Sequence, residues 1–295
     1  MKQLDTRDAM RLSASAACGP WRASWRRAMR RRRARCAAAG LLSLVLACAV
    51  GATLSAPAVE AGEWVSLAEA PNLRDSHVLG TDRLGRDVLV LCLAAGRGSL
   101  GTSALTALSA LCIGLCWGLS AAVLGARARR LLVWPLALLD AVPGLLRALF
   151  IITLCGAKPA VLWWAGLLYA APDLACAVRE RAHAVQQQTY VRIARTLGAT
   201  PSRVLRRHIL PNLLQCMPAY ASAMWSRLLL AESALAWLGV GWPAPNWGNL
   251  LRLGIEASPR TPWLWLGALG ALCGALCALD VLGTALYEAV RASED

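Results

Sequence analysis

The chain has 295 residues and a mean hydropathy of +0.49, and 57% of its residues are hydrophobic while only 16% are charged. An average soluble domain has roughly 45–50% apolar and about 25% charged residues, so this composition excludes an ordinary soluble domain and predicts an integral membrane protein. The formal net charge of +14 does not require a nucleic-acid partner, because the basic residues gather beside apolar stretches.

Six apolar stretches are long enough to cross a bilayer, for which a helix needs about 20 mostly apolar residues. The sequence therefore predicts an all-α membrane protein with six transmembrane helices, which places both termini on one side of the membrane. The predicted spans are residues 37–56, 99–124, 131–155, 159–178, 213–240 and 263–287.

Residues 1–36 form a basic tail before the first span. Its run "WRRAMRRRRAR", residues 25–35, has the charge of a nucleic-acid patch, but it abuts an apolar span and has no binding fold around it, so we interpret it as a membrane anchor. The same region, with "SAPA" at residues 55–58, also fits a signal peptide. Removing that segment would leave five spans and break the charge balance, so we expect the first helix to remain.

The distribution of basic residues predicts the orientation, because short loops rich in Lys and Arg stay cytoplasmic. With the N-terminus inside, the cytoplasmic segments hold 22 of the 31 Lys and Arg residues and the external segments hold seven. The prediction is N-in and C-in, with residues 57–98 external and residues 179–212 and 288–295 cytoplasmic. This describes a multi-pass protein of the cytoplasmic (inner) membrane.

The external segment contains "GTDRLGRD", residues 80–87. Gly and Asp favour turns, so the motif alone also fits a solvated turn cluster. The candidate site residues in this motif are Gly80, Thr81, Asp82, Gly85, Arg86 and Asp87.

Among the charged residues inside the predicted spans, five are singled out as candidate site residues: Asp140, Arg147, Arg227, Glu232 and Asp280. Asp140 and Arg147 are predicted to share nearly one helix face, about 10 Å apart along the axis. Arg227 and Glu232 are about 140° apart around an ideal helix and are poor direct partners. A charge in lipid is costly, so these residues either pair across helices or line the transport path.

The sequence of the cytoplasmic loop predicts two short amphipathic helices. In the first, Tyr190, Ile193, Ala194 and Leu197 recur at helical spacing, and Gly198 is expected to end the helix.

The second helix is predicted to begin with Thr200 as N-cap and Pro201 at the first helical position. Val204, Leu205 and Ile209 form its apolar stripe, opposite basic residues, and Pro211 is expected to mark its end. An apolar ridge of this size lies on the membrane surface or in a groove of another protein.

Signatures of catalysis and metal binding are missing from the sequence. It contains no G-x-x-x-x-G-K-[ST], no G-x-S-x-G and no H-E-x-x-H. Its 11 cysteines form no C-x-x-C, and its three histidines are scattered. We expect no catalytic, cofactor-binding or metal site, so a nucleotide that drives transport would bind another subunit.

The loop segments "YVRIARTLGA" and "RHILPN" resemble the coupling loop of permease subunits of binding-protein-dependent ABC importers. In that family the pattern E-A-A, three residues, G, then I-L-P docks into a cleft of the ATPase. Arg192 stands where the family has Glu and reverses the charge, and Tyr190 completes the predicted coupling set. The matching residues are Ala194, Gly198, Ala199, Ile209, Leu210, Pro211 and Asn212.

Three further segments are similar to the dipeptide, oligopeptide and nickel branch of this family. They are "HVLGTDRLGRDVL" (residues 77–89), "LLDAVPGLLRALFII" (138–152) and "AESALAWLGVGWPAPNWGNLL" (231–251). Together with the loop, the matches extend in the same order over residues 77–291.

The resemblance implies the type I importer permease fold, with residues 99–287 as a core of five transmembrane helices. It also implies a second, related but non-identical permease, an external substrate-binding protein, and two ATPase subunits that hold ATP and Mg. This chain would then bind no cofactor and would be a transport subunit rather than an enzyme.

The favoured substrates are di- or oligopeptides, because the chain has no metal site of its own. The alternatives are a nickel or other small-solute importer of the same branch, a degenerate permease that only supports membrane assembly, and a secondary transporter.

Overall fold

The computed structural model of the protein describes residues 28–54, 67–72, 77–124, 126–242, 245–258 and 261–292, without the side chains of 52–54, 126–129 and 140. Most of the predicted basic tail, parts of the predicted external segment and the last three residues lie outside these ranges.

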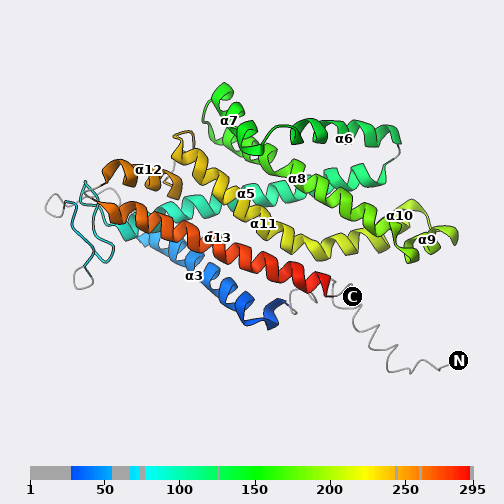
Figure 1. The fold of residues 1–295 in the computed structure, drawn as a ribbon, viewed down its shortest axis with the longest axis horizontal. Coiled ribbons are helices and arrows are strands. Elements are labelled where there is room, and N and C mark those ends of the chain that lie inside the picture. Colours follow the sequence, from blue (N-terminus) through cyan, green and yellow to red (C-terminus); the bar gives the residue numbers. More distant parts are fainter. Residues whose placement is uncertain are drawn as a thin grey trace.

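Within the described ranges the chain folds into helices, and the structure contains no strand there, only an isolated bridge between Thr81 and Asp87. The predicted all-α class is confirmed. The elements, shown in Figure 1, are α3 (Arg32–Leu54), α5 (Val88–Val123), α6 (Ala126–Asp140), α7 (Gly144–Cys155), α8 (Pro159–Gln187), α9 (Thr189–Thr196), α10 (Pro201–Val204), the π-helix η1 (Leu205–Ile209), α11 (Leu210–Trp237), α12 (Trp247–Ala257) and α13 (Pro262–Arg291).

Four of the described helices, α3, α5, α8 and α13, are long and apolar enough to cross a membrane. A fifth span results if the bent pair α6 and α7 counts as one. Helix α11, with 28 residues, is long enough to cross a membrane. Its amino-acid composition, and not its length, therefore excludes it from this group. The count of six spans and the orientation stay predictions.

Helix α5 begins earlier than the sequence indicated. The predicted span starts at residue 99, but the helix starts at Val88, because Asp87 caps it and the preceding turn holds Asp87 in place. With 36 residues, α5 is about 54 Å long at 1.5 Å per residue, which exceeds the roughly 30 Å hydrocarbon core of a bilayer. Residues 88–98, predicted as external segment, therefore form the first turns of a spanning helix.

The predicted third span, 131–155, is broken into two helices. Helix α6 ends at Asp140, α7 begins at Gly144, and the two are bent by 86°. The break contains Pro143, which has no N–H to donate to a helix and disfavours helical dihedrals at the residue before it. Asp140 and Arg147 consequently do not share one helix face, and the prediction that they do was wrong.

Helix α5 is the central helix of the bundle and packs against α3, α8 and α11 (Figure 1). Its contact with α8 depends on glycine, because a Cβ added at Gly114 or Gly118 would lie 2.9 Å from Leu174 or Val178. Small residues at such positions allow the backbones of membrane helices to approach closely.

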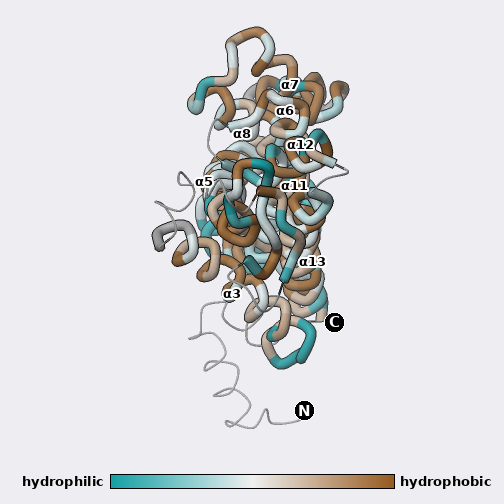
Figure 2. Tube along the Cα trace, turned by 90° about the vertical axis from the view of Figure 1, so that its left-hand side faces the viewer, coloured by the Kyte–Doolittle hydropathy of each residue, from teal (hydrophilic) through white to brown (hydrophobic). Residues whose placement is uncertain are grey.

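The two ends of the bundle carry different elements. Figure 1 shows α9 and α10 at the end where the chain also terminates, and α12 with residues 67–72 and 77–87 at the opposite end. Viewed from the α12 end, hydrophobic stretches predominate in the helices, and hydrophilic stretches lie among them (Figure 2). The predicted coupling loop and the C-terminus thus lie on the same side of the bundle.

Candidate functional site

The first helix of the loop, α9, ends as the sequence predicts. Gly198 has φ +84° and donates its N–H to Arg195 O at 3.0 Å, and Ala199 N donates to Ala194 O at 3.0 Å. Glycine adopts this left-handed conformation without the penalty that a Cβ brings. The chain therefore turns sharply at Gly198 and enters the second helix.

The second helix begins at the predicted cap. Thr200 Oγ1 accepts a hydrogen bond from Arg203 N at 3.4 Å, and Pro201 occupies the first helical position. Such a cap satisfies one of the free N–H groups at the helix start.

The prediction that Pro211 ends this helix was wrong. Val204, Leu205, Ile209 and Leu210 all have helical dihedrals, so α10, η1 and α11 form one continuous helical rod. Pro211 cannot donate a hydrogen bond to the carbonyl four residues earlier, and its ring crowds that carbonyl. The wider π-turn directly before Pro211 accommodates this missing hydrogen bond and the crowding. The loop is therefore joined to α11 without a flexible linker.

The apolar side chains of the loop divide into two groups. Val191, Val204 and Ile209 are buried in the core cluster that also contains Val185 and Leu213. Ile209, predicted as a coupling residue, thus contacts its own chain.

The second group faces outwards. Tyr190, Ile193 and Leu197 are 48%, 52% and 82% exposed, and we call these three residues the apolar ridge. Helix α9 has the predicted apolar face, and within the described part of the chain this face remains largely exposed. Tyr190 is supported by the ring of His208, with centroids 5.6 Å apart.

The other predicted coupling residues differ in their exposure. Arg192 is exposed on α9. The remaining four are partly buried: Ala194, Ala199, Leu210 and Pro211.

The external motif forms a buried turn rather than a solvated one. Thr81 and Asp82 are almost fully buried. Asp82 accepts hydrogen bonds from Leu84 N at 2.8 Å and Arg86 N at 2.9 Å, and its Oδ2 pairs with Arg86 Nη2 at 2.7 Å. Gly80 and Gly85 have φ of +74° and +73°, so the turn uses the left-handed region at both positions.

This turn fixes the start of α5 and ties it to α13. Asp87 Oδ1 accepts from Leu89 N at 2.7 Å, and Asp87 Oδ2 contacts His77 Nδ1 at 3.0 Å. Trp263 Nε1 of α13 donates to Thr81 O at 2.8 Å. The motif therefore holds two spanning helices together at this end of the bundle.

The charges inside the bundle pair across helices. Arg147 Nη2 of α7 lies 3.8 Å from Asp173 Oδ1 of α8, and Arg227 Nη1 of α11 lies 3.7 Å from Asp173 Oδ2. Arg147 also donates to Leu139 O, the end of α6, and so stabilises the corner of the broken span. We call Arg147, Asp173 and Arg227 the charge cluster.

The charge cluster is unevenly exposed. The Arg147 side chain is 7% exposed, whereas those of Asp173 and Arg227 are 42% and 61% exposed. Asp173 is not among the residues singled out from the sequence, although it lies in the predicted span 159–178 and the rule that intramembrane charges are functional candidates applies to it equally.

The remaining charges lie apart from this cluster. Glu232 accepts a hydrogen bond from Thr102 Oγ1 of α5 at 2.5 Å, whereas Arg227 pairs with Asp173. Asp280 is exposed on α13 and borders a hollow with Arg31, Arg32 and Arg33. The side chain of Asp140 lies outside the described residues. No group of three or more His, Cys, Asp or Glu suited to a metal ion occurs among the residues that the structure describes.

A bundle in which four of the described helices are long and apolar enough to cross a membrane defines an integral membrane protein. Residues 114–291 match the family described as binding-protein-dependent transport system inner membrane component, and the chain belongs to this family. Membership confirms the predicted class, a multi-pass inner-membrane transport subunit and not an enzyme.

Particular relatives cover most of the chain. It is 29% identical to the oligopeptide transport system permease protein OppC of Escherichia coli (strain K12) over 272 residues, 92% of this chain and 90% of that protein. It is 31% identical to the glutathione transport system permease protein GsiD of Pectobacterium atrosepticum over 276 residues, again 92% and 90%. The OppC protein of Bacillus subtilis is 29% identical over 225 residues, 76% of this chain and 73% of that protein.

Proposed function

We propose that this chain forms half of the translocation pathway of an ATP-driven importer of di- or oligopeptides, and that separate ATPase subunits drive it through residues 189–209. The observation that carries the proposal is an exposed apolar ridge on α9, which the tight turn at Gly198 joins to the continuous rod of α10, η1 and α11. The peptide class is supported by the names of the oligopeptide and glutathione permeases that the chain resembles.

The apolar ridge is the docking surface for the ATPase. Tyr190, Ile193 and Leu197 follow helical spacing, and a short amphipathic helix with such anchors typically binds in a groove of another protein. Burying a large apolar side chain contributes about 1.5–3 kcal/mol, so three partly exposed side chains supply a few kcal/mol of docking free energy. Arg192 lies exposed beside the ridge, so the groove should carry an acidic residue opposite it.

Movement of the docked loop is transmitted by the helical rod. Because α10, η1 and α11 are continuous, a displacement of the loop moves α11 as a lever rather than being absorbed in a linker. Helix α11 carries Arg227 and Glu232. A rigid-body movement of this kind can switch a pathway between two accessible states.

The charge cluster lines that pathway. Asp173 and Arg227 stay substantially exposed within the bundle, and an exposed charge facing lipid would be strongly unfavourable. We assign this exposed side to the water-filled path between this chain and a second, non-identical permease.

The complete transporter contains partners for each remaining task. An external binding protein delivers the substrate, and two ATPase subunits bind ATP and Mg. The permease contributes the path and the lever.

Reconstitution tests this proposal. The chain is co-purified with its second permease and the ATPase pair, placed in proteoliposomes, and supplied with binding protein and a labelled oligopeptide. We expect uptake that requires both ATP and the binding protein. Assembly without uptake would indicate a degenerate permease, and uptake by the lone chain on an ion gradient would indicate a secondary transporter; either result would overturn the proposal.

A further inference from the structure

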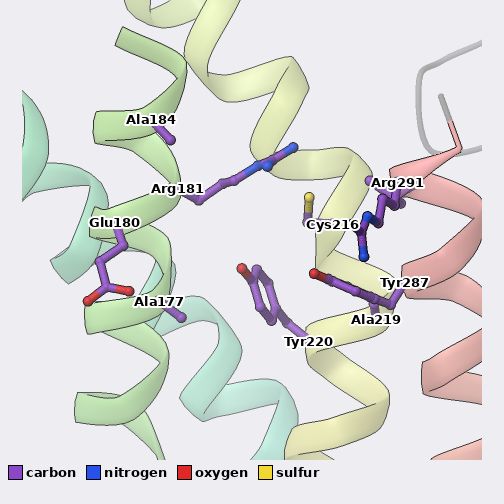
Figure 3. Close-up of a pocket in the computed structure, with 10 residues that line it drawn as sticks. Ala177, Glu180, Arg181, Ala184, Cys216, Ala219, Tyr220, Tyr287 and Arg291 are labelled. Carbon is purple, nitrogen blue, oxygen red and sulfur yellow. The ribbon is translucent and has the colours of Figure 1, made fainter. Parts of the chain in front are cut away.

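A pocket of about 400 Å³ opens between α8, α11 and α13 at the end of the bundle that carries the loop. Its polar lining side chains come from all three helices: Glu180, Arg181, Cys216, Tyr220, Tyr287 and Arg291 (Figure 3). In Figure 3, Arg181 extends from α8 towards α11, and Tyr220 and Tyr287 turn their hydroxyl groups towards the space between the helices. Nothing in the coupling mechanism uses this pocket.

The chemistry of the pocket suits an anion with an apolar body. The lining holds two guanidinium groups and one carboxylate, so it has a net positive charge, and the two phenol hydroxyls add further donors. Guanidinium groups match phosphate oxygens in geometry and can donate two parallel hydrogen bonds. The rest of the wall consists of Ala177, Ala184, Ala219 and Val290, which add apolar surface around the charged groups.

The depth of the pocket matches the headgroup region of a membrane. Arg291 is the last residue of α13, and Arg181 lies six residues before the end of α8 at Gln187, which is about 9 Å along the axis. Tyrosine is enriched at this level of membrane proteins, where its ring is apolar and its hydroxyl is wet. In the predicted orientation this is the cytoplasmic leaflet, whose anionic lipids are drawn to basic residues.

We propose that this pocket binds the phosphate-bearing headgroup of an anionic phospholipid from the cytoplasmic leaflet. The phosphate oxygens accept hydrogen bonds from Arg181, Arg291 and the two tyrosine hydroxyls, and the acyl chains descend along the alanine wall. The lipid then bridges α8 and α11, the two helices between which the loop lies, and ties both to α13.

Lipid retention tests the proposal with a matched control. The full-length chain is exchanged into mixed micelles that contain phosphatidylglycerol and phosphatidylcholine, and bound lipid is counted by native mass spectrometry. Wild type should retain phosphatidylglycerol, and the double variant Arg181→Gln/Arg291→Gln should lose at least about tenfold of this preference, because two charge-assisted contacts are removed. The control Arg32→Gln/Arg33→Gln removes the same charge at the same end of the bundle and should retain the lipid as wild type does. Equal retention by both double variants would overturn the proposal.

A second measurement uses unmodified protein, so it does not depend on the folding of variants. Cys216 lies in the pocket wall and is partly exposed, whereas Cys36 is exposed outside it. Phosphatidylglycerol should slow the reaction of Cys216 with a water-soluble maleimide and leave Cys36 unchanged, as read by peptide mass spectrometry. Equal protection by glycerol 3-phosphate alone would identify free phosphate as the ligand, and protection by an oligopeptide instead would identify a substrate exit; each result, like no protection at all, contradicts a lipid site.

Discussion

Two substitutions on α9, Leu197→Ala and Val191→Ala, separate docking from folding. Leu197 is 82% exposed in the free chain, whereas Val191 is fully buried. Replacing Leu197 by Ala removes about three methylene equivalents at roughly 0.8 kcal/mol each, nearly all of which is available only when a partner covers the ridge. We therefore expect about 2 kcal/mol weaker docking, or about 30-fold in the dissociation constant.

For the buried Val191, the same estimate per methylene group predicts a loss of folding stability instead of a loss of docking affinity. Its two lost carbon groups leave a hole in the core cluster, so Val191→Ala should lower the free energy of unfolding by about 2 kcal/mol. Leu197→Ala should change that free energy by less than about 0.5 kcal/mol, as exposed substitutions usually do.

Both quantities can be measured on one preparation. The permease complex is placed in nanodiscs, its affinity for the ATPase subunits is measured by interferometry, and its thermal unfolding is followed by tryptophan fluorescence. If Leu197→Ala binds the ATPase as tightly as wild type, or unfolds as early as Val191→Ala, the ridge is not the docking surface.

Three further predictions concern the turn, the charge cluster and the external motif. At Gly198 no atom lies within 4 Å of an added Cβ, so a side chain there costs only the backbone penalty of about 1–3 kcal/mol for a left-handed conformation. Gly198→Val should therefore lower substrate-stimulated ATPase activity at normal assembly, while Gly198→Asn should largely keep it. Equal losses in the two variants would contradict the role of the turn. Asp173→Asn leaves the buried Arg147 without its anion and should cost about 1–3 kcal/mol of stability, less than for a fully buried pair because Asp173 is half-exposed; thermal unfolding should show no such loss for the exposed surface pair variant Glu256→Gln. Asp82→Asn removes a buried ion pair and weakens two backbone hydrogen bonds, so amide hydrogen exchange at the start of α5 should accelerate by at least about tenfold. Exchange at the wild-type rate would refute the conclusion that this turn fixes the start of α5.

Much of the local structure follows from short-range rules. Thr200, Pro201 and Gly198 act where the sequence places them, because caps and left-handed glycines depend only on the few residues around them. The external motif was recognised as a turn, but its burial under Trp263 involves a residue 182 positions away from Thr81. The start of α5 was missed because Asp87 caps a helix whose first turns include the charged Arg97, which an apolar window excludes.

The sequence by itself determined that the chain is an all-α membrane protein, where most of its helices lie, and that one polar loop carries an amphipathic face, since these follow from apolar length, periodicity and punctuation by Gly and Pro. Only the tertiary structure decided which apolar residues of α9 face inwards, that Pro211 lies within a continuous rod, and that Asp173 joins Arg147 and Arg227. These depend on how separate helices approach one another, and a pattern along one helix specifies a face without specifying what that face meets.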